Sequence, residues 1–202
     1  MLAALREGYS GIFRFGGRMA VAPFWMFAGV NGLLVAVAMM FAMQPAFDQM
    51  AEGAARVARE HPEDVTVTSG PGHYSVEIRG HHPDVLPDMD ILIGGMVFVL
   101  SIAFLLIAAA AVRRLHDSDR RGWWILLPLP FLAIGLATMR PLFDDFGRGT
   151  ETGAPPDFSL FLLLFFNNIV YLACVLAVII LLALPGTAGA NRFGAPPSAG
   201  QD

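Results

Sequence analysis

The amino-acid sequence predicts an all-α membrane protein with four transmembrane helices and a small extracytoplasmic insertion, made of a helix and a β-hairpin, between the first two spans. Composition is the first observation that predicts this fold: 55% of the 202 residues are hydrophobic and 15% are charged, which leaves too few charges for the surface of a soluble domain. The second is that the hydrophobic residues form four long runs. The third is that the segments between these runs alternate between rich and poor in arginine.

The four hydrophobic runs define the predicted spans. Residues 23–43, 91–112 and 158–184 contain no charged side chain, and each reaches the roughly 20 residues that cross the hydrocarbon core of a bilayer. Residues 123–139 form a shorter run of about 17 residues, at the lower limit for a span. The first run is too long for the core of a signal peptide, and no cleavage site of small residues follows it, so we expect an uncleaved membrane anchor.

The arginine distribution orients the spans. Residues 1–22 contain three arginines and one acidic residue, and residues 113–122 contain four arginines. Residues 44–90 contain nine acidic residues against three arginines, and residues 140–157 contain four against two. Because cytoplasmic loops are enriched in arginine and lysine, we expect the amphipathic entry 1–22 and the loop 113–122 to be cytoplasmic. Four spans then place the tail, 185–202, in the cytoplasm as well.

The segment 44–90 is the predicted extracytoplasmic insertion. Its first part, 47–60, repeats apolar residues with the period of a helix. Residues 65–79 contain two stretches of alternating apolar and polar residues around a turn rich in glycine and proline, which is the pattern of a β-hairpin. An isolated hairpin is only marginally stable in water, so we expect it to pack on the helix or on the membrane surface.

The third span contains two prolines near its start. Pro128 and Pro130 lack the N–H groups that would bond to the carbonyls of Trp124 and Leu126, so we expect a bend there. The alternative is a re-entrant hairpin, which would place residues 140–157 in the cytoplasm. The acidity of that segment favours a full crossing.

The loop 113–122 carries the densest group of reactive side chains. If the helix of the second span continues into this loop, Asp117 can pair with either Arg113 or Arg114, and His116 shares a face with Arg113. Such a loop is either a topological anchor with arginines at the interface or a site for a lipid phosphate or another anion. We favour the anchor, because cytoplasmic loops are generally rich in arginine.

The histidines give a weaker signal. Four of the five lie in the segment 44–90, close to Asp84, Asp88 and Asp90, and they are His61, His73, His81 and His82. Their spacing matches no known metal-ligand motif, so neither a metal site nor a cofactor is predicted. The single cysteine, Cys174, excludes an intramolecular disulfide.

Three blocks of sequence carry a family resemblance. The first is Phe15-Gly16-Gly17-Arg18, followed by Phe24-Trp25. The second is Arg113-Arg114-Leu115-His116-Asp117, followed by Gly122-Trp123-Trp124. The third consists of Gly186 and Gly189 before Asn191-Arg192-Phe193-Gly194 and Pro196. In this order the blocks resemble the bacterial inner-membrane family known as domain of unknown function 805, which implies a helical bundle without an assigned activity.

The chain departs from the family pattern at two places. Val21-Ala22-Pro23 stands where the family usually has an arginine before its Phe-Trp pair, and the segment 44–90 is an insertion that the pattern does not describe. On the predicted topology all three blocks lie at the cytoplasmic face. We therefore expect polar residues from them to converge there and either to staple the bundle or to bind an anionic lipid headgroup: Arg18, Arg113, Arg114, His116, Asp117, Asn191 and Arg192.

The favoured function is that of a non-enzymatic integral inner-membrane protein, which acts as a scaffold, a partner subunit or a lipid-interacting bundle. The expected partners are the lipid bilayer, its anionic headgroups, and another membrane protein or a second copy of the chain, but no nucleic acid. One alternative is a membrane enzyme that acts on a lipid or anionic substrate with His116 as acid/base, although no serine nucleophile is evident. Another is a small transporter or channel along Asn31, Asn167 and Asn168, which the absence of ionisable residues inside the spans disfavours.

Overall fold

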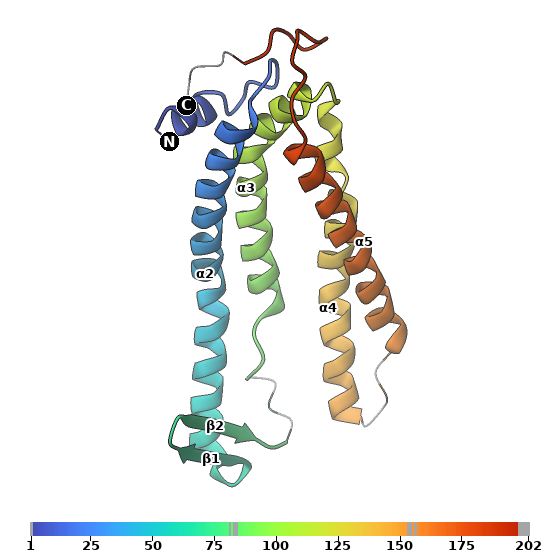
Figure 1. Ribbon diagram of the computed structural model, residues 1–202. Helices are drawn as coiled ribbons and strands as arrows, with labels where there is room; N and C mark the ends of the chain where they lie inside the picture. The colour runs from blue at the N-terminus through green and yellow to red at the C-terminus, as the bar shows by residue number, and fades with distance from the viewer. Residues whose placement is uncertain (1, 81, 83–84, 153–154, 156, 198–202) are drawn as a thin grey trace.

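The computed structural model describes residues 2–80, 82, 85–152, 155 and 157–197. Its four long helices are α2 (Val21–Glu60), α3 (Met89–Asp117), α4 (Leu129–Thr152) and α5 (Phe158–Ala183). A short helix, α1 (Leu2–Ser10), precedes them, and the strands β1 (Val65–Gly70) and β2 (His73–Ile78) stand between α2 and α3. The connection from α3 to α4 lies at one end of the bundle together with α1 and the segment after α5; we call this the α3–α4 end (Figure 1). The β-hairpin lies at the opposite end, the hairpin end.

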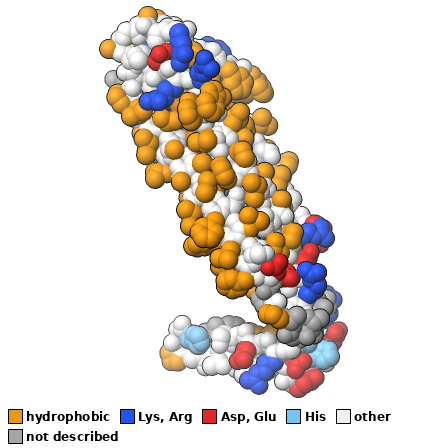
Figure 2. All heavy atoms as spheres, turned by 90° about the vertical axis from the view of Figure 1, so that its right-hand side faces the viewer, with side chains coloured by type: hydrophobic (Ala, Val, Ile, Leu, Met, Phe, Trp, Pro, Cys, Tyr) orange, Lys and Arg blue, Asp and Glu red, His pale blue; other side chains and the backbone are white. Residues whose placement is uncertain are grey.

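The surface of the bundle is that of a membrane protein. All four long helices have the length and apolar composition of membrane spans. Hydrophobic side chains cover the long side seen in Figure 2, and charged side chains gather at its two ends. On α5, Phe165, Phe166 and Leu176 are each at least 50% exposed. Soluble proteins rarely expose so continuous an apolar surface, so the chain is a multi-pass membrane protein.

The first span and the predicted helix 47–60 form one helix, α2, and not two. Pro45 lies inside this helix and removes one of its backbone hydrogen bonds. The helix continues because Ala46 is buried and because the Gln44 side chain donates a hydrogen bond to Asp48 across the proline, at 2.9 Å. The predicted helix 47–60 is therefore a continuation of the first span and not a separate element.

The predicted hairpin, 65–79, is confirmed as a two-stranded antiparallel sheet. Val65 pairs with Ile78 and Gly70 with His73, so only Pro71 and Gly72 remain for the turn. Gly72 has a φ of 76°, a conformation that glycine adopts without strain.

The helices on the two sides of the loop 113–122 do not end and begin where the hydropathy predicts. The helix α3 continues through Asp117, so the loop itself is short. A 3-10 turn, η3 (Gly122–Leu126), follows it, and α4 begins only at Leu129. Pro130 thus falls in the first turn of α4, where a missing N–H removes no helical bond.

The helix α4 also extends into the predicted loop 140–157, where Leu142 is buried. It shows no reversal between Leu129 and Thr152, which does not fit the re-entrant alternative. Asp157 caps the start of α5, and the hydrogen bonds that Ser159 donates to its carboxylate lower the pKa of Asp157.

The hydrophobic core lies at the α3–α4 end. It consists of Met19, Phe24, Phe27, Ala110, Ala111, Leu115 and Leu182. The buried run of alanines from Ala108 to Ala111 has only methyl side chains, which lets neighbouring helices approach α3 closely. Away from this end, the pair α2–α3 and the pair α4–α5 diverge (Figure 1). The core therefore joins α2, α3 and α5 at the end of the bundle where the three sequence blocks also lie.

Candidate functional site

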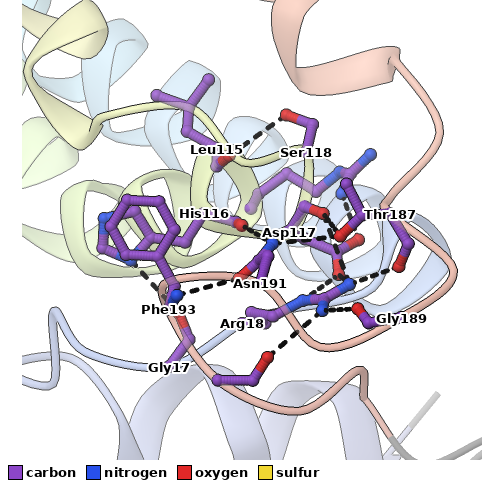
Figure 3. Close-up of polar contacts among 12 residues, drawn as sticks. Gly17, Arg18, Leu115, His116, Asp117, Ser118, Thr187, Gly189, Asn191 and Phe193 are labelled. Carbon is purple, nitrogen blue, oxygen red and sulfur yellow. Dashed lines mark hydrogen bonds and ion pairs between the residues drawn. The ribbon is translucent and has the colours of Figure 1, made fainter.

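Asp117, the last residue of α3, is the centre of a buried polar cluster at the α3–α4 end (Figure 3). Its side chain is 5% exposed, and each carboxylate oxygen binds a different arginine. Oδ1 lies 2.9 Å from Nε and 2.8 Å from Nη2 of Arg18. Oδ2 accepts a hydrogen bond from Nη1 of Arg114 at 2.5 Å. We call Arg18, Arg114, His116, Asp117 and Asn191 the Asp117 cluster.

Arg114 joins the end of α3 to the end of α5. Its Nε donates to the carbonyl of Leu182 at 2.9 Å, and its Nη2 donates to the carbonyl of Leu184. The last carbonyls of a helix have no partner within the helix. A guanidinium group in this position satisfies them and interacts favourably with the negative end of the helix dipole. Arg114 therefore acts as the cap of α5.

Arg18 holds the segment that follows α5. Its Nη2 donates to the carbonyl of Thr187 and its Nη1 to the carbonyl of Gly189, both at 2.7 Å. The N–H of Thr187 in turn donates to the carbonyl of Asp117 at 2.9 Å. These bonds place the segment across the end of α3, so one arginine near the start of the chain fixes its last described part.

Asn191 and His116 complete the cluster. The side-chain amide of Asn191 donates to the carbonyl of His116 at 2.9 Å and to Oγ1 of Thr187 at 3.0 Å. The His116 ring stacks on Phe193, with 3.7 Å between the ring centroids and 5° between the planes, and its Nδ1 lies 3.2 Å from the Gly17 carbonyl. The third sequence block therefore packs on the first two.

The charges of the cluster nearly balance. Two buried guanidinium groups and one carboxylate leave a net charge of about +1, while the ends of α3 and α5 each contribute roughly half a negative charge. The geometry is also tight, since a Cβ atom on Gly186 would lie 2.1 Å from Oδ2 of Asp117. The near-balance of charge explains how two arginines and an aspartate can be buried beside an apolar core.

Arg113 lies outside the Asp117 cluster and contacts α1. Its side chain is 0% exposed, its Nε donates to the carbonyl of Ala109 at 3.3 Å, and its Nη1 lies 3.7 Å from a carboxylate oxygen of Glu7. Within the described part of the chain, neither Nη1 nor Nη2 has a hydrogen-bond partner. Burial of a guanidinium group without full hydrogen bonding is costly.

The predicted polar residues thus fall into three places. Arg18, Arg114, His116, Asp117 and Asn191 lie together, Arg113 lies under α1, and Arg192 lies at the exposed rim, where it binds Asp119. Of the two pairings open to Asp117 on its own helix, the one with Arg114 forms. Sequence reasoning missed Glu7 and Thr187. The signals were present, because Glu7 is the one acidic residue of the first 22 and Thr187 lies inside the third block.

The asparagines of the spans do not line one path. Asn167 and Asn168 line a groove of about 430 Å³ between α4 and α5, together with Tyr171. Asn31 is buried in α2, where its amide donates to the Phe27 carbonyl at 2.8 Å and its oxygen accepts from Tyr9 at 3.3 Å. Asn31 therefore does not lie with Asn167 and Asn168 along the path that the transporter alternative requires.

The chain has no significant match among curated proteins or solved structures. A family model matches residues 12–195, a range that contains the whole Asp117 cluster as well as the core around it. That model is described as Protein of unknown function (DUF805). Because the match spans nearly the whole chain, the protein belongs to this family, as its three sequence blocks predicted.

Proposed function

We propose that the protein is a non-enzymatic scaffold of the bacterial inner membrane, in which the Asp117 cluster staples the bundle at the cytoplasmic face. The observation that carries this proposal is that both carboxylate oxygens of Asp117 are taken by arginines, whose other contacts are backbone carbonyls at the ends of α3 and α5 and beyond α5. A cluster so occupied holds chain segments together. Few of its hydrogen-bonding groups remain available to bind a substrate.

The contacts of His116 support a structural role for this residue. Here one face of the ring is covered by Phe193, and Nδ1 faces the Gly17 carbonyl. Both contacts tie the first and third sequence blocks to α3.

The scaffold proposal is tested by native mass spectrometry of protein extracted gently from its own membrane. The variants are Asp117→Asn, which breaks the staple, and His116→Phe, which keeps an aromatic ring against Phe193. We expect the wild type and His116→Phe to retain a partner protein, a second copy or a lipid, and Asp117→Asn to lose it. A wild-type protein that carries no partner contradicts the proposal, as does a partner that only His116→Phe loses.

Arg113 favours a second candidate function, which is binding of an anionic lipid headgroup beneath α1. Its two unpartnered terminal nitrogens form the fork that binds phosphate oxygens in pairs. The helix α1 covers Arg113, and Oε1 of Glu7 on this helix lies 3.7 Å from Nη1 of Arg113, beyond hydrogen-bond distance. Leu2 and Phe13 flank this cover and are 79% and 87% exposed, as expected of a segment that lies in the membrane interface. A headgroup phosphate would replace the Glu7 carboxylate.

This second candidate is tested with dihexanoyl-phosphatidylglycerol, sodium phosphate and dihexanoylglycerol, which has the same chains without phosphate. We expect dihexanoyl-phosphatidylglycerol to bind to the wild type. Arg113→Gln should weaken that binding at least tenfold, which is on the order of the free energy of one lost hydrogen bond to a charged group. Glu7→Gln should strengthen it. Arg6→Gln, an exposed arginine on α1, is the matched control and should bind as the wild type does. Equal binding of the phosphate-free lipid, or no gain in Glu7→Gln, would refute the site.

A further inference from the structure

Two histidines and two carboxylates meet where the hairpin joins α2. His61 follows the end of α2, Glu63 and Asp64 belong to the 3-10 turn η1 (Pro62–Asp64), and His82 lies beyond β2. We propose that these four side chains bind a divalent transition-metal ion of the zinc class. The proposal is independent of the scaffold function and of the Asp117 cluster, which lies at the opposite end of the bundle.

Two pairs of donor atoms have the spacing of a coordination shell. One ligand atom each from His61, Glu63 and Asp64 lie within 4.8 Å of one another. Nδ1 of His61 is 3.5 Å from Oε1 of Glu63, and Nε2 of His82 is 3.1 Å from Oδ2 of Asp64. Nε2 of His82 also lies 3.0 Å from the Arg79 carbonyl, a contact that an ion would replace. Zinc bonds to nitrogen and oxygen are about 2.0–2.2 Å long, so two ligands of a tetrahedral ion stand about 3.4 Å apart. The two measured separations lie on either side of that value.

The histidine rings approach each other as well. The ring centroids of His61 and His82 are 5.5 Å apart, so His82 lies beside the group that His61 forms with Glu63 and Asp64. His61 and Glu63 are 51% and 68% exposed. A metal ion can therefore reach these two ligands directly from solvent.

Backbone hydrogen bonds hold the ligands in place. The N–H of Asp64 donates to the carbonyl of His61 at 3.0 Å, and the N–H of Arg79 donates to the carbonyl of Asp64 at 2.8 Å. These two bonds tie η1 to the end of α2 and to the end of β2. The two carboxylates thus have fixed backbone positions before any ion binds.

Gly80 brings the last ligand back to the others. Its φ is 91°, a backbone conformation that favours glycine, and it reverses the chain just before His82. A Cβ atom at this position would lie 3.4 Å from Nε2 of His82 and 3.8 Å from Oδ2 of Asp64. A side chain there would both strain the turn and crowd the contact between the two ligands.

The ligand chemistry selects the class of ion. Imidazole nitrogen combined with carboxylate oxygen suits zinc and neighbouring transition metals, whereas calcium and magnesium prefer oxygen ligands throughout. Two carboxylates also neutralise a divalent ion. Bound there, the ion would join the end of α2 to the loop that leads into α3.

The experiment is a calorimetric titration of the full chain in detergent with zinc chloride, after treatment with a chelator and without a polyhistidine tag. We expect one equivalent of zinc to bind. His61→Ala and His82→Ala should each weaken binding by at least about tenfold, since even the loss of an outer-shell partner costs a metal site that much. His73→Ala is the matched control, because His73 is exposed on β2 outside the group, and it should bind as tightly as the wild type.

Two further variants make the test independent of hairpin stability. Glu63→Gln replaces an exposed ligand by an amide of the same size and should also weaken zinc binding, with an unchanged circular dichroism spectrum. Gly80→Ala should weaken it by displacing His82. The proposal would be overturned if the wild type bound no zinc. It would also be overturned if His61→Ala and Glu63→Gln both kept the wild-type affinity, or if His73→Ala lost affinity as they do.

Discussion

At the scale of single residues, the buried ion group around Asp117 is better understood as a specificity device than as a source of stability. Burial of charges costs several kcal/mol per ion, and their attraction repays this only when every hydrogen bond is made. Here Arg18 and Arg114 share one carboxylate and fill their other positions with carbonyls. The group therefore stabilises one arrangement of the segments and raises the free energy of the others, in which its charges would lack partners.

Asp117→Asn should destabilise the protein strongly. The substitution removes the negative charge and leaves the guanidinium groups of Arg18 and Arg114 buried without a carboxylate partner. Removal of one member of a buried ion pair costs about 3–5 kcal/mol. Thermal unfolding in detergent measures the change. Asp119→Asn is the control, because Asp119 and its partner Arg192 are about half exposed and such pairs contribute roughly 0–1 kcal/mol. Equal losses in the two variants would contradict the staple.

Gly186→Ala should also destabilise the protein, and Gly189→Ala should not. The added Cβ at residue 186 would overlap Oδ2 of Asp117 at 2.1 Å, whereas the space around Gly189 is open to at least 4 Å. Overpacking of this kind costs about 1–3 kcal/mol. The two unfolding temperatures, compared with that of the wild type, check the prediction. Identical values would mean that Asp117 can shift without loss.

The sequence limits what could be foreseen at this scale. Arg113 and Arg114 stand four and three residues before Asp117, and helix geometry alone allows both pairings. Packing decides between them, because Arg114 contacts the end of α5 and Arg113 contacts α1. Such contacts join residues that are far apart in the chain, and no local pattern contains them.

At the scale of the elements, hydropathy located the long helices but not their ends. The helices α2 and α4 run beyond the apolar runs, to Glu60 and Thr152. A helix satisfies its own backbone hydrogen bonds whatever its side chains are, so it can continue into polar sequence where a few residues such as Ala46 and Leu142 still pack. Hydrophobic runs report the thickness of the membrane and not the length of the helix.

The contact between α1 and α2 gives a prediction for an element. A Cβ atom on Gly8 would lie 2.2–2.6 Å from ring atoms of Phe27, so Gly8→Ala should lift α1 from the bundle. Trypsin should then cleave faster after Arg14. Gly16→Ala, which meets no atom within 4 Å, is the control and should be cleaved at the wild-type rate. Unchanged cleavage in Gly8→Ala would show that α1 is held by other contacts.

At the scale of the whole molecule, the arginine distribution makes a prediction about orientation. In a Cys174→Ala background, Ser69→Cys lies in the hairpin and Ser10→Cys at the end of α1, and both positions are exposed. A maleimide that cannot cross the membrane should label Ser69→Cys in intact spheroplasts, and Ser10→Cys only after permeabilisation. The reverse pattern would place the Asp117 cluster on the outer side and remove the basis for a cytoplasmic staple.

The position of the staple in the chain bears on how the protein is made. Asp117 and Arg18 precede α4 and α5, but the carbonyls of Thr187 and Gly189, to which Arg18 donates, follow the last span. During synthesis, all four spans are made before the segment that supplies these carbonyls. The contacts of Arg18 can be completed only after the segment that follows α5 has left the ribosome. The four spans are therefore synthesised before the staple that joins the two ends of the sequence can form in full.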